Sequence, residues 1–269
     1  MPPGVFMHRI AILTRPAGRN DGLARKLQAG GWQTLELPAL AIEPLRVPAA
    51  QLPRPQDHDL VVFVSGIAAR LYLEQLALAG TPRWPAAAVA ATVGPASAAA
   101  VRAWPGFGPD ARLVHPSPEA PRHDSEALWD ELARQGVHPR RALLVRATQG
   151  RDWLAERLAA AGAEVRRHET YRRRPAAWPD GTVRRLREWQ AGGGLAVWLA
   201  TSSEGIDAAH AVVRRLDLLP WWAACRFVVT HPRLSAHLAA RLAEDGLPAP
   251  ATTPCVPDED AIAQAFAAS

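Results

Sequence analysis

The chain has 269 residues, of which 48% are hydrophobic and 21% charged, and its formal net charge is +5. This length favours two domains, and the composition is that of a globular protein rather than a disordered one. No apolar run reaches the ~18 residues that a membrane span needs, and Met1–Arg9 lacks the apolar core of a secretory signal. We therefore expect a cytoplasmic protein without a membrane partner.

Cysteine and histidine usage argues against a metal centre. Cys225 and Cys255 are too few for a disulfide framework and lack metal-ligand spacing, so we expect reduced packing residues. The histidines form no His-Glu-x-x-His pattern. The positive charge favours an anionic partner, but the arginines are scattered apart from Arg172–Arg174. A small polyanion is therefore expected rather than nucleic acid.

The first part of the chain predicts a strand at 9–14, a helix through Leu23 and Leu27, and a strand at 34–37, with glycine and proline at the boundaries. The same strand-helix-strand pattern repeats later in the chain. Residues 142–162 align on 11–31 at a constant offset of 131, with nine identities in 21 positions. Arg15 and Arg146 are one of the identical pairs.

The repeat continues through the later elements. The predicted strand 60–66 corresponds to 195–203, and the predicted strand and helix start at 90–95 correspond to 227–232 at an offset of 137. A last helix opens at 123–128 and again at 257–262. A repeat of this length indicates two copies of a domain-sized pattern rather than a solenoid.

Strands that alternate with helices of ten to fifteen residues predict parallel sheets with helices on both faces. We therefore predict an α/β protein of two doubly wound parallel-sheet domains that arose by internal duplication. In such folds ligands bind beyond the carboxyl ends of the strands. The strand-to-helix turns are therefore the segments to search for a site.

Several cofactor and nucleophile motifs are missing. Lys26, the only lysine, lies inside a predicted helix, so there is no phosphate-binding loop. Gly106–Gly108 is followed by neither the third glycine nor the helix of a dinucleotide-binding fingerprint. Thr201–Gly205 lacks the first glycine of a nucleophile elbow. Nucleotide binding and acyl-enzyme hydrolysis are therefore disfavoured.

Polar residues at the predicted strand ends remain as candidates for anion binding, because a helix N-terminus carries unpaired N–H groups and a partial positive charge. The candidates are Arg15, Ser65, Gly94, Ser97, Arg151, Ser202 and Ser203. Each serine could equally be a simple helix cap, and Arg15 and Arg146 could equally close a turn.

Tyr171 stands where the second repeat leaves its strand. A phenol is protonated at neutral pH, so it can donate a hydrogen bond to a departing oxygen. Packing is the alternative role, and it is the better explanation for Tyr72, which lies inside a helical run.

Seven motifs resemble the uroporphyrinogen-III synthase family in order and spacing over nearly the whole chain. They are Ile12–Pro16, Leu37-Pro38, Val62–Ser65, Val93–Ser97, Gly150–Leu154, Tyr171–Arg173 and Thr201–Gly205. One residue and one four-residue segment depart from the family pattern. Gly66 stands where many relatives have proline, and His231–Leu234 replaces a Gly-Pro-Thr-Thr sequence.

The resemblance implies a discontinuous domain of residues 1–40 plus 174–269 and a second domain of residues 45–169. Residues 41–44 and 170–173 would form a two-stranded linker. This division agrees with the repeat if each domain pairs the opening unit of one copy with the later units of the other. The resemblance also places the ligand in a cleft between the domains.

The activity implied by the resemblance is that of a cyclising hydro-lyase of porphyrin and heme biosynthesis that uses no metal or cofactor. We expect a monomer. Its substrate, the polycarboxylate hydroxymethylbilane, is closed with inversion of its last ring to uroporphyrinogen III and water. By position Tyr171 matches the tyrosine that assists loss of the hydroxyl. The alternatives are a non-catalytic tetrapyrrole or small-anion sensor on the same scaffold, and a periplasmic-type receptor, which would need a signal peptide.

Overall fold

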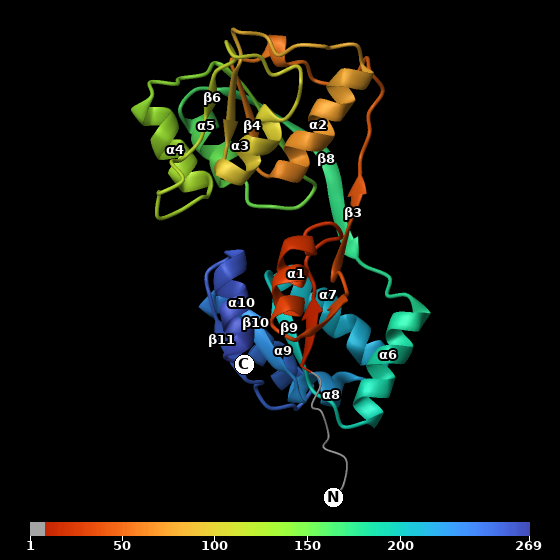
Figure 1. Cartoon of the computed structure of the whole chain (residues 1–269). Helices are drawn as coiled ribbons and strands as arrows, with labels where there is room; N and C mark the ends of the chain where they lie inside the picture. The colour runs from red at the N-terminus through yellow and green to blue at the C-terminus, as the bar shows by residue number, and fades with distance from the viewer. Residues whose placement is uncertain (1–8) are drawn as a thin grey trace, which may run out of the picture. The chain divides into compact units, whose positions relative to one another are not determined.

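The chain divides into two compact units, seen in a computed structural model that describes residues 9–269 (Figure 1). Unit 1 comprises Met1–Ala41 and Arg174–Ser269, and unit 2 comprises Ile42–Arg173. The prediction that Met1–Arg9 is not a secretory signal falls almost entirely on residues 1–8, which lie outside the described residues. Among the described helices, none combines the length and hydropathy needed to cross a bilayer.

Unit 1 is built on a five-stranded parallel sheet in the order β11-β10-β9-β1-β2. Its strands are β1 (Ile10–Leu13), β2 (Gln33–Glu36), β9 (Ala196–Ala200), β10 (Arg226–Val229) and β11 (Thr252–Pro254). Ile10 and Ile12 of β1 pack into one core and Ala11 and Leu13 into another, because successive side chains of a strand point to opposite faces. Both faces of the sheet are therefore covered.

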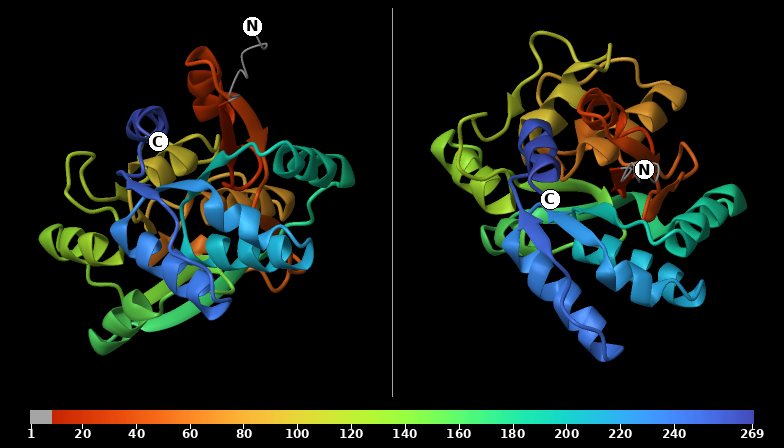
Figure 2. Two further views of the ribbon diagram at one scale, coloured as in Figure 1. Left: turned by 90° about the horizontal axis from the view of Figure 1, so that it is seen from below. Right: turned by 60° about the horizontal axis from the view of Figure 1, so that its bottom comes forward.

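The helices of unit 1 form two layers. The Ala11 face is covered by α1 (Asp21–Ala29) and α10 (Glu259–Ala267). The Ile12 face is covered by α6 (Asp180–Ala191), α7 (Ser203–Arg215), α8 (Leu219–Ala224) and α9 (Pro232–Glu244). The left view of Figure 2 shows α1 and α10 on one side of this sheet and α7 to α9 on the other.

Unit 2 contains a six-stranded sheet in the order β3-β8-β7-β4-β5-β6. Its strands are β3 (Leu40–Pro44), β4 (Leu60–Phe63), β5 (Val89–Thr92), β6 (Leu113–Val114), β7 (Arg141–Ala147) and β8 (Glu164–Pro175), and a 3-10 turn covers Pro55–Asp57. Leu45 N–H donates to Thr170 O at 2.8 Å and Ala176 N–H to Ala39 O at 3.0 Å, so β3 runs antiparallel to β8. Residues 41–44 and 170–173, predicted as linkers, lie on these two strands.

The helices of unit 2 also cover both faces of their sheet. Val61 and Phe63 of β4 pack with α2 (Gly66–Leu78) and α3 (Pro95–Arg102). Leu60 and Val62 pack with α4 (Ser125–Arg134) and α5 (Trp153–Ala160). The prediction of two doubly wound parallel-sheet domains is confirmed.

The duplication can be followed element by element. α2 and α7 have the same bounds at an offset of 137, as do β5 and β10, and β1-α1-β2 is matched by β7-α5-β8 at an offset of 131. Without β3, the sheet of unit 2 has the strand order of unit 1. Each unit therefore pairs the opening segment of one copy with the later segments of the other.

Both sheets reverse the direction of winding at one place. The order β2-β1-β9-β10-β11 is the 2-1-3-4-5 order of doubly wound sheets, which reverses between β1 and β9. In unit 2 the equivalent place lies between β7 and β4. Ligands of such folds bind beyond the carboxyl ends of the strands at this point.

Candidate functional site

The predicted site residues divide between the units, and each group lies at the carboxyl ends of its own sheet. Unit 2 holds Ser65, Gly94, Ser97, Arg151 and Tyr171, and unit 1 holds Arg15, Ser202 and Ser203. Of these, the structure brings Ser65 and Tyr171 into direct contact.

Ser65 and Tyr171 meet at the start of α2. Ser65 has extended backbone angles (φ −161°, ψ 157°) and is the N-cap of α2, with Oγ accepting the Ala68 N–H at 3.1 Å. The same Oγ lies 3.2 Å from Tyr171 Oη. Tyr171 is only 4% exposed and packs in the core cluster that includes Phe63 and Tyr72. A serine and a tyrosine 106 residues apart thus form one hydroxyl pair.

A β-bulge directs Tyr171 towards α2. In the β7–β8 register Arg146 lies opposite Glu169 but Ala147 lies opposite Tyr171, so Thr170 is the extra residue. His168 makes an edge-to-face contact with the Tyr72 ring of α2, with centroids 5.6 Å apart, and Tyr171 packs in the same core cluster as Tyr72. In a regular strand His168 and Tyr171, three residues apart, would point to opposite faces of the sheet. The extra residue Thr170 places both side chains on the same face.

The first turns of α2 and α3 lie next to each other. A Cβ added at Gly66 would lie 3.7 Å from the Cα of Ser97, which is 8% exposed in the first turn of α3. Gly94 is the N-cap of α3, and a Cβ there would come within 2.9 Å of His123 Cβ. Glycine at 94 therefore allows close packing of the segment that leads into α4.

Arg151 is engaged elsewhere in unit 2. Its guanidinium forms a bidentate ion pair with Glu126 in the first turn of α4, at 2.6 Å and 2.9 Å. The hydrogen bond to Glu126 raises the pKa of Arg151, and the same bond lowers the pKa of Glu126. Since the Arg151 side chain is 65% exposed, this pair contributes little stability. Within residues 9–269, no hydrogen bond or ion pair links Arg151 to Ser65 or Tyr171.

Arg146, the repeat partner of Arg15, closes a loop. It is 6% exposed, and it donates to Ala147 O at 3.0 Å and Gly150 O at 2.8 Å, besides an ion pair with Asp152. Gly150 has φ +154°, a conformation that favours glycine. Of the two roles considered for this arginine, turn closure is the one that the structure supports.

Arg15 has a different environment. Its side chain is 16% exposed, and its guanidinium faces Glu259 of α10 at 3.7 Å, beyond hydrogen-bonding distance. Burial lowers the pKa of Arg15, an effect that the Glu259 charge opposes. The guanidinium is therefore held at the end of β1 with a single loose ion pair among the described residues.

Three helices of unit 1 begin near this strand end with capped N-termini. Ser202 Oγ accepts the Gly205 N–H at 3.0 Å at the start of α7, and Ser203 is the first residue of that helix. His231 caps α9 by accepting the Arg233 N–H at 3.1 Å, so the divergent 231–234 segment keeps an ordinary helix start. Asp258 caps α10.

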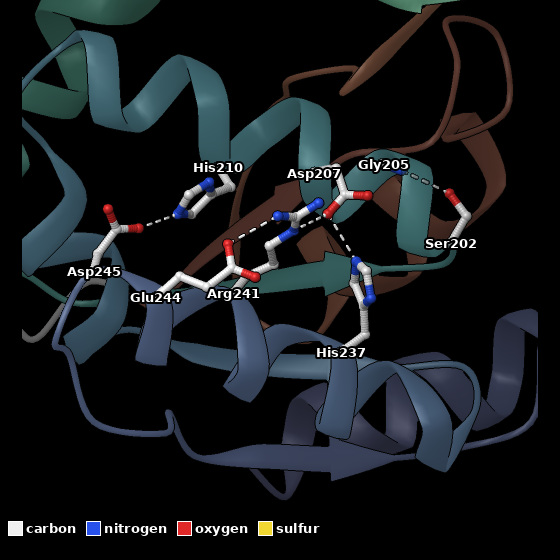
Figure 3. A network of polar contacts seen from close by, with 8 residues as sticks. All are labelled: Ser202, Gly205, Asp207, His210, His237, Arg241, Glu244 and Asp245. Atoms are coloured by element: carbon white, nitrogen blue, oxygen red, sulfur yellow. Dashed lines mark hydrogen bonds and ion pairs between the residues drawn. The ribbon is translucent and has the colours of Figure 1, made fainter.

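A polar network that the sequence patterns did not reveal holds α7 against α9 (Figure 3). Asp207 accepts from His237 at 2.7 Å and Arg241 at 2.6 Å, and His210 bonds to Asp245 at 2.7 Å. Burial raises the pKa of Asp207, but hydrogen bonds from Arg241 and His237 outweigh it and lower the pKa overall. The spacing of His237 and Arg241, one turn apart on α9, was the available signal.

No cluster of three or more His, Cys, Asp or Glu side chains that could bind a metal ion together occurs in residues 9–269. The oxygen atoms and N–H groups of the helix starts are suited to carboxylates and hydroxyls instead.

Comparison with known proteins decides the family. The family model for uroporphyrinogen-III synthase HemD matches residues 21–254. The chain belongs to this family. It is 31% identical over 234 residues to uroporphyrinogen-III synthase from Salmonella typhimurium, covering 86% of this chain and 90% of that protein. Uroporphyrinogen-III synthase from Escherichia coli is 28% identical over the same shares of the two chains.

Solved structures of uroporphyrinogen-III synthases have the same fold. A mutant enzyme from Thermus thermophilus aligns with a TM-score of 0.53 at 17% identity, covering 97% of this chain and 98% of the other. The Helicobacter pylori enzyme aligns with a TM-score of 0.54 at 13% identity, covering 97% and 99%. The resemblance drawn from the motifs is confirmed.

Proposed function

We propose that this member of the uroporphyrinogen-III synthase family closes hydroxymethylbilane to uroporphyrinogen III and water with inversion of the last ring. The family match over residues 21–254 is the observation that carries the proposal. The strand ends of both units support it, because they present capped helix starts and the Arg15 guanidinium. No observation favours the non-catalytic sensor.

The substrate carboxylates are assigned to the helix starts and arginines of each unit. In unit 1 these are Arg15, Ser202 and Ser203, and in unit 2 they are Gly94, Ser97 and Arg151, while Ser65 is assigned to bind the substrate beside Tyr171. A carboxylate accepts hydrogen bonds from the unpaired N–H groups of a first helical turn and gains from the helix dipole. Arg151 would have to share or leave its pair with Glu126.

The chemistry starts with loss of the hydroxyl. The C–O bond breaks with its electron pair going to oxygen, and the oxygen takes up a proton. Water departs, and the remaining bilane is an azafulvene. The last ring then attacks through its substituted carbon to form a spiro intermediate, which reopens and closes inverted with release of a proton. No electrons are exchanged with an oxidant or reductant, and we propose that the reaction proceeds without a metal or cofactor.

Tyr171 is assigned to assist the departure of the hydroxyl, with its phenol beside Ser65. Acid help from one group typically contributes about 10² to 10⁴-fold, and this leaving group departs readily. Much of the remaining catalysis would come from holding the linear chain in a pose that brings its two ends together. Tyr171 is therefore important in this scheme without being indispensable.

We further propose that the protein works as a cytoplasmic monomer without nucleic acid or membrane partners. The net charge of +5 and the scattered arginines suit a small polyanion that is captured from solution.

The test is to add freshly made hydroxymethylbilane to the purified protein and to separate the isomers of the oxidised product. We expect the type III isomer. If the protein binds the bilane but only the spontaneous type I isomer forms, the synthase proposal is wrong and the non-catalytic sensor is favoured.

A further inference from the structure

The hydroxyl pair at the start of α2 has a defined direction. Ser65 Oγ and Tyr171 Oη are 3.2 Å apart, a distance at which either could donate. Tyr171 is 4% exposed, and in the part of the chain that is described Ser65 is the hydrogen-bond partner of its hydroxyl. If the Tyr171 hydroxyl accepted from Ser65, its own proton would have no acceptor among the described residues, which is unfavourable for a buried group. Donation from the phenol to Ser65 is therefore the direction that the surroundings favour.

The acceptor capacity of Ser65 is then filled. A serine hydroxyl offers two acceptor lone pairs and one proton. Its oxygen accepts the Ala68 N–H at 3.1 Å and the Tyr171 O–H at 3.2 Å. Its own proton remains for a third partner, and Ser65 is only partly buried, whereas Tyr171 is buried.

We propose that the Ser65 hydroxyl contacts the departing hydroxyl of the substrate, and that Tyr171 is a positioning residue that acts through Ser65. This inference rests on the proposed function. The leaving oxygen takes the proton of Ser65 as the C–O bond breaks, and Ser65 Oγ takes the proton of Tyr171. The proton that the last ring releases on closure returns to the phenolate, so the pair ends each turnover as it began.

The N-terminus of α2 supports this relay. α2 is 13 residues long, and its first turn surrounds Ser65 Oγ with a partial positive charge. That charge favours the transient loss of a proton from the oxygen. Hydrogen bonds aligned in a chain also polarise one another, so donation by Tyr171 and donation by Ser65 reinforce each other.

The repeat supplies a matched control in unit 1. Ser202 corresponds to Ser65 at the offset of 137 and makes the same cap, to Gly205 N–H at 3.0 Å. Both tyrosines of the chain, Tyr72 and Tyr171, belong to unit 2, where Tyr72 donates to Pro53 O at 2.7 Å and Tyr171 contacts Ser65, whereas Ser202 belongs to unit 1. Ser202→Ala therefore removes a helix cap without disturbing a tyrosine.

Turnover of the purified full chain is the first readout. We expect Ser65→Ala to lower kcat about 100-fold and Tyr171→Phe about 10-fold, with KM changed little in either. Because Tyr171 acts through Ser65, the double variant should match Ser65→Ala, and Ser65→Thr, which keeps the hydroxyl and the cap, should stay within about threefold of the original kcat. Ser202→Ala serves as the stability control, with a loss of thermal stability similar to that of Ser65→Ala.

The Raman doublet of tyrosine is the second readout, and it needs no substrate. The intensity ratio of its two bands is low for a phenol that donates a strong hydrogen bond and higher for one that accepts a bond or makes none. Tyr72 contributes equally before and after the change, so a difference spectrum of the original protein and Ser65→Ala reports Tyr171. We expect the ratio to rise in Ser65→Ala and to stay constant in Ser202→Ala.

The two readouts separate the possible failures. A ratio that falls or stays constant in Ser65→Ala overturns the direction of the hydrogen bond, whatever the activity. Independent losses of kcat that multiply in the double variant overturn the relay. Absence of the type III isomer with the original protein overturns the proposed function, while the Raman result still decides how the hydroxyl pair is arranged.

Discussion

Arg15 and Arg146 are the same residue of the repeat, yet the two units use it differently. β1 ends at Leu13, so Arg15 lies beyond the strand, whereas β7 continues to Ala147 and contains Arg146. Pro16 follows Arg15 and has no N–H for the sheet, whereas Ala147 at the equivalent position pairs with Tyr171. Pro16 thus distinguishes Arg15, which we propose as a ligand contact, from Arg146, which closes a loop of the fold.

The same comparison explains why the tyrosine is found in unit 2. The longer β7 gives β8 a partner beyond the bulge at Thr170, and the bulge turns Tyr171 towards α2. In unit 1, β2 ends at Glu36, and beyond it the chain stays beside the end of β1 through hydrogen bonds from Leu37 N–H to Leu13 O at 2.9 Å and from Ala39 N–H to Thr14 O at 3.0 Å. The two units therefore share one pattern of strands and helices but differ in how the side chains are arranged at the strand ends.

The largest expected effect is on the fold of unit 2. Arg146→Ala removes the donor to two loop carbonyls and leaves Asp152 without its main ion pair, so we expect a loss of about 3 kcal/mol in the free energy of unfolding. Urea unfolding followed by tryptophan fluorescence measures it. A loss below that of Arg15→Ala would contradict the assignment of Arg146 to loop closure.

A second difference concerns His168, which has Leu37 as its counterpart at the offset of 131. Burial, aided by the Arg166 charge, lowers the pKa of His168 to about 4, and its Nε2 has no hydrogen-bond partner among the described residues. The unfolded chain therefore binds the proton more tightly. The stability of unit 2 should be complete above about pH 6.5 and fall towards pH 4, by about 2 kcal/mol at pH 5.

The test of this acid dependence is His168→Leu, which copies the residue of the other repeat. We expect the urea midpoint of this variant to change less between pH 7 and pH 5 than that of the original chain. The same decrease in both proteins would assign the acid sensitivity to other groups.

Arg15 should affect substrate binding rather than the fold. Since its one ion pair among the described residues is loose, we expect Arg15→Ala to raise KM about 10-fold, with kcat nearly unchanged and less than about 1 kcal/mol of stability lost. Steady-state kinetics with hydroxymethylbilane provides the measurement. An unchanged KM would remove Arg15 from the assigned ligand contacts.

The smallest effect is expected at Arg151. Glu126→Gln weakens the bidentate pair and leaves the guanidinium freer for a carboxylate, so KM should fall about two- to threefold with little change in stability. A rise in KM would show that Glu126 is needed to hold Arg151 in place.

The repeat and the positions of glycine and proline were sufficient to predict the two doubly wound sheets, because hydrophobic periodicity and turn chemistry are local properties. The bulge at Thr170 was not predictable, since β8 is rich in arginine and shows no clear alternation that an inserted residue would break. The different roles of Arg15 and Arg146 depend on strand length and burial, which identical side chains cannot reveal.

The most direct test of the proposed synthase activity is the rate of type III isomer formation, measured at increasing protein concentration with a fixed amount of fresh hydroxymethylbilane. We predict a rate proportional to protein concentration. The share of type I isomer should fall as the enzymatic rate exceeds the rate of spontaneous ring closure. A product that stays type I at every protein concentration would contradict the assignment of this chain as a synthase.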